Sequence, residues 1–310
     1  MTDAARFPLI LALVAFVVAP RAPAWLSRPA RSPTPFCPAY FQPNNPARLR
    51  LFPLDAPEAI ASLPGGLPSN LRGIAFSPDG EALYGQVGNP LNRSAGIYKI
   101  EFKPSRFSVV PGSIGTGEVW CLAVSSVSGR ITLSGKSWAL DSTGVFEIDP
   151  AAATSMVLAP GTASGCGGKG GFMSPDGKRA ITNDAKQLRL VVLRTGASTA
   201  IKGTSADTQS VWSPDGRWIA TVRGGRIGLI DADDPTRSRG LGRSGDGPLV
   251  WSPDSRYLLL RTSPLSCALT VYGESLEVVD VETGGRNEVK SSHCTITAGT
   301  LGWLDRRFVR

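Results

Sequence analysis

Phe76-Ser77-Pro78-Asp79-Gly80 is the stretch that decides the fold, because the chain repeats it three more times with small changes. Proline fixes the backbone angle φ for a turn, aspartate accepts hydrogen bonds from the amides that follow, and glycine takes the left-handed conformation. Each copy lies between two apolar segments and therefore predicts a tight hairpin turn between two strands. The predicted structural turn residues are Ser77, Pro78, Asp79, Gly80, Ser174, Pro175, Asp176, Gly177, Ser213, Pro214, Asp215, Gly216, Ser252, Pro253 and Asp254.

The spacing of these turns is nearly regular. Ser174 and Ser213 are 39 residues apart, and Ser213 and Ser252 are again 39 apart. Ser77 precedes Ser174 by 97 residues, and residues 120–133 form a degenerate copy within that gap. Periods of about 40 to 50 residues with several short strands each are typical of β-propeller blades.

Every repeat also supplies a later apolar strand, which brings the number of predicted blades to five. These strands are residues 96–100, 144–149, 188–193, 226–231 and 276–280. Residues 301–309 resemble the opening strands of a further repeat, and residues 48–55 resemble a later strand, so the two ends can complete a sixth blade. We therefore predict an all-β fold, a single β-propeller of six blades of four-stranded antiparallel sheets, closed by N- and C-terminal strands. Five or seven blades are the alternatives.

The composition agrees with an all-β globular protein. The chain has 310 residues, including 35 glycines and 25 prolines, and it lacks long stretches with the 3.6-residue period of amphipathic helices. Its formal net charge is +8, which can indicate a nucleic-acid or anionic-membrane partner. The basic residues are scattered and form no run with interleaved aromatics, so the sequence disfavours nucleic-acid binding.

The N-terminal stretch predicts targeting out of the cytoplasm. Residues 7–18 form an apolar run that is too short to span a bilayer comfortably, and Ala22-Pro23-Ala24 supplies small residues for cleavage. Residues 1–24 are therefore predicted to be a signal peptide, with an uncleaved membrane anchor as the alternative. Eight prolines between Pro20 and Pro46 predict an extended linker over residues 25–46, which leaves residues 47–310 for the propeller. The predicted location is secreted or periplasmic.

The repeated Ser-Pro-Asp-Gly, followed by a basic residue and a hydrophobic strand, resembles the TolB-type, WD-like propeller repeat over about residues 47 to 310. Proteins with these repeats include periplasmic TolB, the propeller domains of prolyl oligopeptidase-like peptidases and some sugar-acting lyases. The resemblance implies the fold, and its motif residues carry over as turn residues and not as a site. This chain departs from TolB, which has an α/β domain before its propeller, and from the peptidases, which add an α/β-hydrolase domain.

Little in the sequence indicates catalysis or cofactor binding. The single histidine, His293, and the absence of a Gly-x-Ser-x-Gly elbow argue against a Ser-His-Asp hydrolase, and one histidine excludes a multi-histidine metal site. Residues 165–170 match Gly-x-Gly-x-x-Gly, but the next element is a β-hairpin and not the helix that a dinucleotide requires. Residues 135–137 end like a phosphate-binding loop, but Arg130 stands where its first glycine belongs.

The acidic residues Asp231, Asp233 and Asp234 could contact a cation such as calcium, but acidic residues in a strand-ending turn are more often simply solvated. We therefore predict no catalytic residue, no cofactor and no metal site.

The chain has five cysteines, so at least one cannot form a disulfide within the chain. Cys121 and Cys166 precede the inner hairpins of neighbouring blades, and Cys267 and Cys294 flank the outer strands of the fifth blade. We predict these two pairs as disulfides in an oxidising compartment and leave Cys37 out of them.

The predicted function is that of a non-catalytic extracytoplasmic scaffold, acting as a monomer, that binds a protein or glycan ligand at the propeller face. The alternative is a lyase or hydrolase that acts on a polysaccharide at the channel mouth. A third hypothesis is a component of cell-envelope machinery resembling TolB. The N-terminal segment could also tether the propeller to a membrane.

Overall fold

The computed structural model describes residues 36–42, 48–51, 59–61, 71–89, 91, 93–102, 104–160, 173–183, 186–205, 208–243, 249–262, 275–289 and 300–305. These residues lie in one compact unit, Pro33–Arg310. Every regular element within them is a β-strand, which confirms the predicted all-β class.

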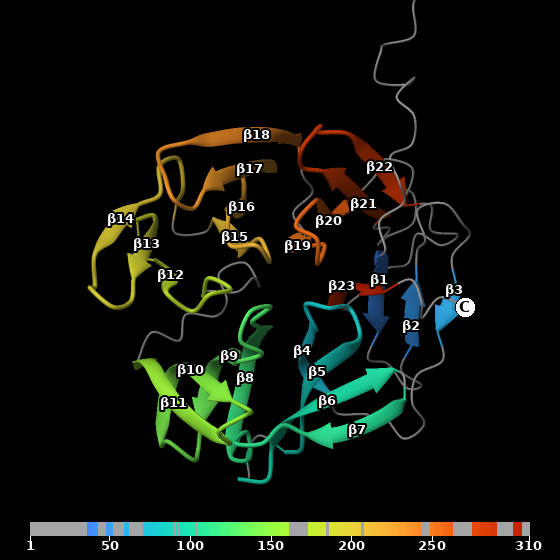
Figure 1. Ribbon diagram of the computed structural model, residues 1–310, viewed down its shortest axis with the longest axis vertical. Coiled ribbons are helices and arrows are strands. Elements are labelled where there is room, and N and C mark those ends of the chain that lie inside the picture. Colours follow the sequence, from blue (N-terminus) through green and yellow to red (C-terminus); the bar gives the residue numbers. More distant parts are fainter. Residues whose placement is uncertain are drawn as a thin grey trace, which may run out of the picture. The chain divides into compact units, whose positions relative to one another are not determined.

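In the described residues the strands form six sheets that follow one another in chain order around a common centre (Figure 1). Each sheet is one antiparallel blade. Blade 1 contains β4 (Arg72–Phe76), β5 (Ala82–Val87), β6 (Gly96–Phe102) and β7 (Ser105–Val109); blade 2 contains β8 (Thr116–Val124), β9 (Ile131–Ser137), β10 (Ser142–Asp149) and β11 (Thr154–Pro160). The arrangement is the predicted β-propeller.

Blades 3 to 5 continue the order. Blade 3 contains β12 (Arg179–Asn183), β13 (Leu188–Val192) and β14 (Ser198–Ala200); blade 4 contains β15 (Gln209–Trp212), β16 (Trp218–Arg223), β17 (Arg226–Asp231) and β18 (Ser238–Arg243); blade 5 contains β19 (Leu249–Trp251), β20 (Tyr257–Thr262), β21 (Ser275–Asp280) and β22 (Arg286–Val289). Five of the six sheets thus have four described strands. Blade 3 has three, and an isolated bridge between Met173 and Ala180 lies where the other blades have their first strand.

Blade 6 is built from both ends of the described chain. Its order is β23 (Thr300–Asp305), β1 (Phe36–Gln42), β2 (Arg48–Leu51) and β3 (Ala59–Ala61), and Ala39 of β1 lies opposite Gly302 of β23. N- and C-terminal strands therefore close the ring, as predicted. One C-terminal strand contributes, together with three strands from the N-terminal side.

The predicted boundary between linker and propeller is wrong. Strand β1 lies inside the stretch 25–46 that the proline content assigned to a linker. Pro38 is accommodated because β1 pairs with β2 only from Ala39 onward, so the missing amide of Pro38 removes no bond from that ladder. Pro38 instead lies opposite Trp303 of β23.

The hydrophobic core lies between neighbouring blades. Blades 4 and 5 share the cluster that contains Leu229 and Leu258, and blades 1 and 2 share the one that contains Ile97 and Phe146. Three more clusters join blade 3 to 4, blade 5 to 6 and blade 6 to 1. At five of the six contacts between neighbouring blades, the described residues bury their apolar side chains by stacking one blade against the next, which favours a closed ring.

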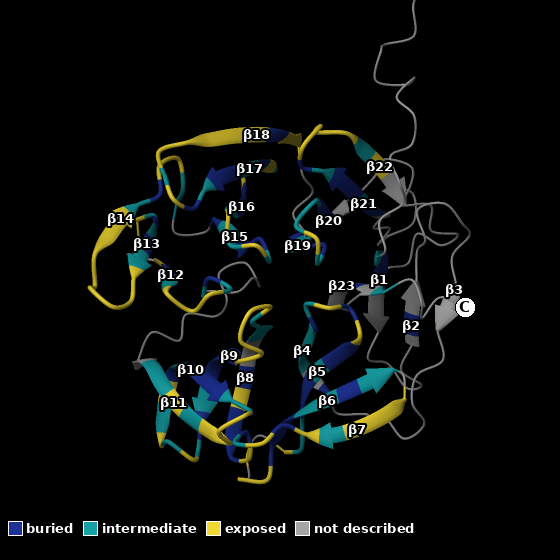
Figure 2. Ribbon diagram, in the orientation of Figure 1, coloured by how far each residue is buried: buried dark blue, intermediate teal, exposed yellow. Residues whose placement is uncertain are grey.

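The outermost strands are the exposed ones. Figure 2 shows β18 mostly exposed and β17 beside it mostly buried, and β7 and β14 are also largely exposed. Exposed side chains therefore lie mainly on the outer strands and at the two ends of the blades.

Candidate functional site

The Ser-Pro-Asp turns share one hydrogen-bonding pattern. In each, the serine hydroxyl donates to the aspartate Oδ1 over 2.5 Å. In blade 4, Ser213 Oγ accepts the Trp218 amide at 2.8 Å and Asp215 Oδ1 accepts the Arg217 amide at 3.0 Å. Gly216 completes the turn by donating its amide to the Ser213 carbonyl. Because Ser213 is fully buried, these bonds satisfy polar groups that water cannot reach.

The blade 5 turn departs from the glycine of the other three. Gly80, Gly177 and Gly216 have φ angles of 71°, 69° and 71°, and Ser255 takes the same position with φ 58°. A left-handed serine is strained, but its hydroxyl accepts the Asp215 amide of blade 4 at 2.9 Å. The departure thus supplies a bond between two blades.

These turns lie at one end of the blades, which we call the turn end: residues 77–81, 125–130, 174–178, 213–217 and 252–256. Hydrogen bonds join the turns of different blades. Ser125 Oγ of blade 2 donates to the Pro175 carbonyl of blade 3 at 2.6 Å, and Ser126 Oγ donates to the Pro214 carbonyl of blade 4 at 2.9 Å. The turn end is therefore a connected network of backbone and hydroxyl groups.

Tryptophans at the ends of innermost strands connect further blades. Trp251 Nε1 of blade 5 donates to the Val211 carbonyl of blade 4 at 3.1 Å, and Trp303 Nε1 of blade 6 donates to the Val250 carbonyl of blade 5 at 3.3 Å. In both cases the acceptor precedes the tryptophan of the preceding blade. The repeat thus encodes a contact between blades as well as a turn.

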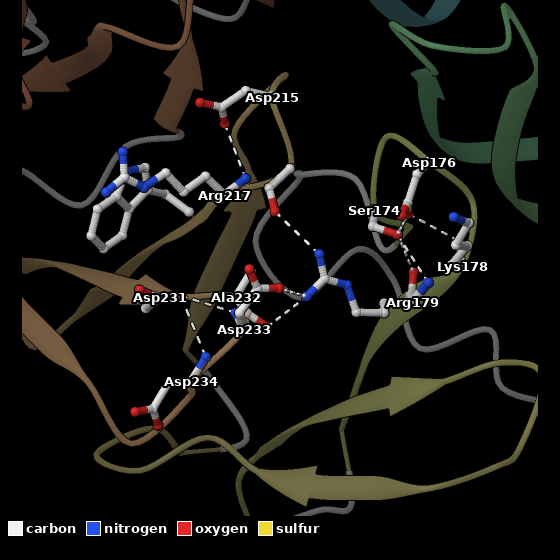
Figure 3. Close-up of polar contacts among 12 residues, drawn as sticks. Ser174, Asp176, Lys178, Arg179, Asp215, Arg217, Asp231, Ala232, Asp233 and Asp234 are labelled. Carbon is white, nitrogen blue, oxygen red and sulfur yellow. Dashed lines mark hydrogen bonds and ion pairs between the residues drawn. The ribbon is translucent and has the colours of Figure 1, made fainter.

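Arg179 joins blades 3 and 4 (Figure 3). Its Nη1 donates to the Ala232 carbonyl at 2.7 Å and to Asp233 Oδ1 at 2.8 Å, and its Nη2 donates to the Gly216 carbonyl at 3.3 Å. The guanidinium also lies 5.2 Å from the ring centroid of Trp212. Since Asp233 is strongly exposed, the two carbonyl bonds and the stacking fix Arg179 more than the ion pair does.

Asp231, Asp233 and Asp234, which the sequence offered as contacts for a cation, form hydrogen bonds and an ion pair within the protein (Figure 3). Asp231 Oδ1 accepts the amides of Asp233 and Asp234, and Asp233 pairs with Arg179. Asp234 bonds to Thr236. The hydroxyl and then the amide of Thr236 outweigh desolvation and hold the pKa of Asp234 below its ordinary value.

The turn aspartate of blade 3 also stays ionised more readily than usual. Desolvation raises the pKa of Asp176, but the Ser174 hydroxyl, the Lys178 amide and the charges of Arg179 and Lys178 together lower it below its ordinary value. The ionised form of the Asp176 carboxyl group is therefore the form that makes these contacts in the turn.

Residues 135–137 belong to strand β9 and not to a phosphate-binding loop. A Cβ at Gly135 would collide with the carbonyl of Glu118, so this glycine serves close packing between strands. Lys136 Nζ lies 3.7 Å from the ring centroid of Trp138, and Ser137 Oγ accepts the Leu140 amide at 3.2 Å. The lysine thus covers an aromatic ring beside its strand.

Several predicted residues lie outside the described part of the chain. These are His293, the glycine-rich residues 165–170, Cys166, Cys267 and Cys294, and for Cys121 only the backbone in β8 is described. Both disulfides therefore remain predictions. Cys37 is buried in blade 6, where its thiol contacts the Pro38 carbonyl at 3.4 Å.

The opposite end of the blades, which we call the loop end, joins second to third strands and one blade to the next. Its connections vary greatly in length. Only Gly224 and Gly225 join β16 to β17, whereas residues 263–274 join β20 to β21 and residues 290–299 join β22 to β23. At the turn end, the links between first and second strands in blades 1, 4 and 5 each span five residues. The links between third and fourth strands, also at the turn end, span from two residues (103–104) to seven (52–58), so lengths range more widely at the loop end.

Two features are absent from the part of the chain that the structure describes. No helix there is long and apolar enough to cross a membrane. No group of three or more histidine, cysteine, aspartate or glutamate side chains lies close enough there to hold a metal ion.

No known family model matches the chain, and no curated protein matches it in sequence. Its fold is nevertheless shared with solved structures. One is TolB from Acinetobacter baumannii, with a TM-score of 0.58 and 14% identity over 86% of this chain and 66% of that one. The fold is that of a TolB-like β-propeller. This chain therefore spans just under two thirds of the length of that TolB.

Two further solved structures resemble this chain. A chain of a nidogen–laminin complex matches with a TM-score of 0.57 and 11% identity, over 87% of this chain and 97% of that one. An oligogalacturonate lyase in complex with manganese matches with a TM-score of 0.45 and 15% identity, over 83% and 75% of the two chains. The last likeness is too weak to carry an argument, and the others establish the propeller scaffold alone.

The contacts between blades were not predicted from the sequence. The pattern contained a signal, because Phe76, Trp212 and Trp251 each directly precede a Ser-Pro-Asp turn. Large apolar residues at a repeated position indicate a repeated packing role. Their indole donors and the carbonyls that receive them come from different repeats, so the pairing needed the assembled ring.

Proposed function

We propose that this protein is a non-catalytic extracytoplasmic scaffold that binds a protein or glycan through the loop end of its propeller. The observation that carries the proposal is the contrast between the two ends of the blades. At the turn end, polar groups form hydrogen bonds between blades, such as the Ser125 hydroxyl to the Pro175 carbonyl and the Asp215 amide to the Ser255 hydroxyl. The loop end carries connections of very different lengths on that fixed frame.

Rigid frames with variable connections suit recognition, because the frame fixes the connections in space at little entropic cost on binding. The apolar run over residues 7–18 and the small residues after it support export as a signal peptide or an anchor. The chain would then meet its ligand outside the cytoplasm.

The full chain is first screened against defined glycans of neutral, uronate-bearing and sulfated type, and against purified envelope lipoproteins. Any ligand found is then mapped by amine labelling. Lys186 and Lys202 at the loop end should be protected by the ligand, whereas the exposed Lys178 at the turn end should label equally with and without it.

Protection of Lys178 alone would overturn the assignment to the loop end. Mass spectrometry of the recovered glycan provides the second check. Shortened or unsaturated products would contradict a non-catalytic role and favour the lyase or hydrolase alternative.

A further inference from the structure

Three arginines lie side by side at the loop end of blade 4. In the register of the sheet, Arg223 of β16 lies opposite Arg226 of β17, which in turn lies opposite Arg243 of β18. Residues that are directly opposite in antiparallel strands project from the same face of the sheet, with Cβ atoms about 5 Å apart. All three arginines are exposed. We call this set the arginine row.

The arginine row is electrostatically unfavourable as it stands. Like charges directly opposite one another destabilise a sheet. None of the three has an ion pair with an acidic residue in the described part of the chain. The nearest acidic residues along the sequence are Asp215 and Asp231 for Arg223, Asp231 for Arg226 and Asp246 for Arg243, and Asp246 lies outside the described residues.

Some arginines elsewhere in the ring are paired with carboxylates. Arg130 pairs with Glu147 and Asp149 in blade 2, and Arg286 pairs with Glu277 in blade 5. The arginine row therefore contrasts with these two arginines, whose charges are balanced by carboxylates of their own blades.

The surroundings of the row leave its charged groups accessible. The two-residue turn Gly224-Gly225 adds no side chain, and a Cβ at Gly224 would meet only open space. Arg223 Nη1 donates to the Gly203 carbonyl of the preceding blade at 2.8 Å, which holds this side chain beside the exposed Lys202. Four cationic residues from two blades thus belong to one region of the loop end.

The geometry points to an anion-binding site at the arginine row, which takes the sulfate or phosphate groups of an anionic glycan. Guanidinium groups bind such oxyanions through two parallel N–H···O bonds. Neighbouring arginines at strand spacing can hold one doubly charged group or two successive groups along a chain. Bound anions would also remove the repulsion within the row.

A glycan fits this region better than a membrane or a nucleic acid. The exposed large apolar residues of the described chain, such as Leu91, Val127 and Leu193, belong to other blades, so no described residue of blade 4 offers the row an apolar side chain to insert into lipid. Among the described residues at the loop end of blade 4 there is likewise no aromatic side chain on which bases could stack. The inference rests on the proposed binding function and narrows its ligand class.

The test measures binding of a sulfated hexasaccharide to the full chain by calorimetry at several salt concentrations. The variant carries Arg223→Gln, Arg226→Gln and Arg243→Gln together. The matched control is Arg194→Gln, which removes an exposed arginine from a turn at the opposite end of blade 3. We expect the triple variant to bind at least about ten-fold more weakly, with a smaller salt dependence, and the control to stay within about two-fold of wild type.

Folding is checked in the same samples. Because the substitutions remove like-charge repulsion, the triple variant without ligand should melt at or above the wild-type temperature, and the hexasaccharide should raise the melting temperature of wild type only. If wild type and the triple variant bind the hexasaccharide with equal affinity, the arginine row is not the anion-binding site. Binding to anionic phospholipid vesicles without binding to the hexasaccharide would overturn the assignment of a glycan as the ligand and would indicate a membrane surface instead.

The two proposals can fail separately. If a neutral ligand binds at the loop end and the triple variant retains it, the anion site fails while the binding scaffold stands. If the hexasaccharide binds through the arginines and is cleaved, the non-catalytic role fails while the anion site stands.

Discussion

Two contacts between blades solve the same problem by different means. Between blades 4 and 5, Trp251 donates its indole N–H to the Val211 carbonyl, and Asp215 bonds to Ser255. Between blades 6 and 1, the residue equivalent to Trp251 is Phe76, whose ring has no such donor. Its ring instead lies so close to Gly302 of β23 that a Cβ there would overlap it.

The difference follows from how the two blade pairs are encoded. Blade 5 has Trp251 and blade 6 has Trp303 at this position, and each donates to the preceding blade, whereas blade 1 has Phe76. Blade 6 is assembled from strands near the two ends of the described chain, and its contact with blade 1 relies on close packing and on the bond from the Asp305 amide to the Gly80 carbonyl at 3.0 Å. Substitutions should therefore harm the two contacts for different reasons.

The largest effect is expected for Gly302→Ala. The added methyl group overlaps the Phe76 ring, and a buried strand beside a packed sheet has little room to shift. We expect a loss of about 3 kcal/mol or more in the free energy of unfolding, measured by urea denaturation. The control is Gly240→Ala in β18, where a Cβ would meet nothing within 4 Å. Equal midpoints for Gly302→Ala and wild type would show that the closure of the ring tolerates extra volume.

The next effect concerns the turn serines, which should behave alike in both blade pairs. Ser213→Ala in blade 4 and Ser77→Ala in blade 1 each remove a hydroxyl that bonds to the turn aspartate and accepts an amide, from Trp218 and Ala82 respectively. Leaving a buried amide unsatisfied costs about 1–3 kcal/mol. Urea denaturation should give losses of similar size for both variants. A much larger loss for one of them would mean that its turn also determines the contact between blades.

The sequence predicted the fold well because the fold depends on local, repeated chemistry. Proline, aspartate and glycine at a fixed spacing specify a turn without reference to distant residues, and the 39-residue period then indicates blades. The boundary at residue 46 was misplaced because prolines were counted without the pairing partner of each one. Pro38 lies in β1 one residue before the pairing with β2 begins at Ala39, a position that the proline count could not reveal.

The candidate site was less accessible to sequence reasoning. Arg223 and Arg226 flank the Gly-Gly turn and could have been paired from the sequence, but Arg243 joins them only through the register of β17 with β18. That register includes a shift between Ile227 and Gly228, so simple counting along the strands would misplace the pairing.

A third prediction examines the indole bond itself. Trp251→Phe keeps an aromatic ring between blades 4 and 5 and makes this contact resemble that of blades 6 and 1 in lacking the donor. The Val211 carbonyl loses its bond, and the smaller ring leaves a gap, so we expect a loss of about 1–2 kcal/mol in urea denaturation. Trp303→Phe removes the equivalent bond between blades 5 and 6 and should cost a similar amount. No loss in either variant would assign these tryptophans to packing alone.

A smaller effect distinguishes strain from bonding at Ser255. Ser255→Gly relieves the strain of the left-handed φ of 58°, but it also removes the hydroxyl that accepts the Asp215 amide. Its two effects on stability therefore oppose each other. Ser255→Ala keeps the strain and loses the bond. We expect Ser255→Ala to be less stable than Ser255→Gly by about 1 kcal/mol in thermal denaturation. The reverse order would mean that the left-handed backbone carries no strain at this position.

The smallest effect is a dependence on pH at the blade 3 turn. The folded-state pKa of Asp176 lies below its ordinary value of 3.8, so its ionised form stabilises the fold fully above that value. This stabilisation is lost as the pH falls through the folded-state pKa, because the carboxyl group is then protonated in both states. Asp176→Asn should therefore be less stable than wild type near about pH 6, and the gap should narrow towards about pH 2.5. The measurement is a series of urea titrations across that range. A gap that stays constant would assign the role of Asp176 to hydrogen-bond geometry, with no contribution from the charges of Lys178 and Arg179.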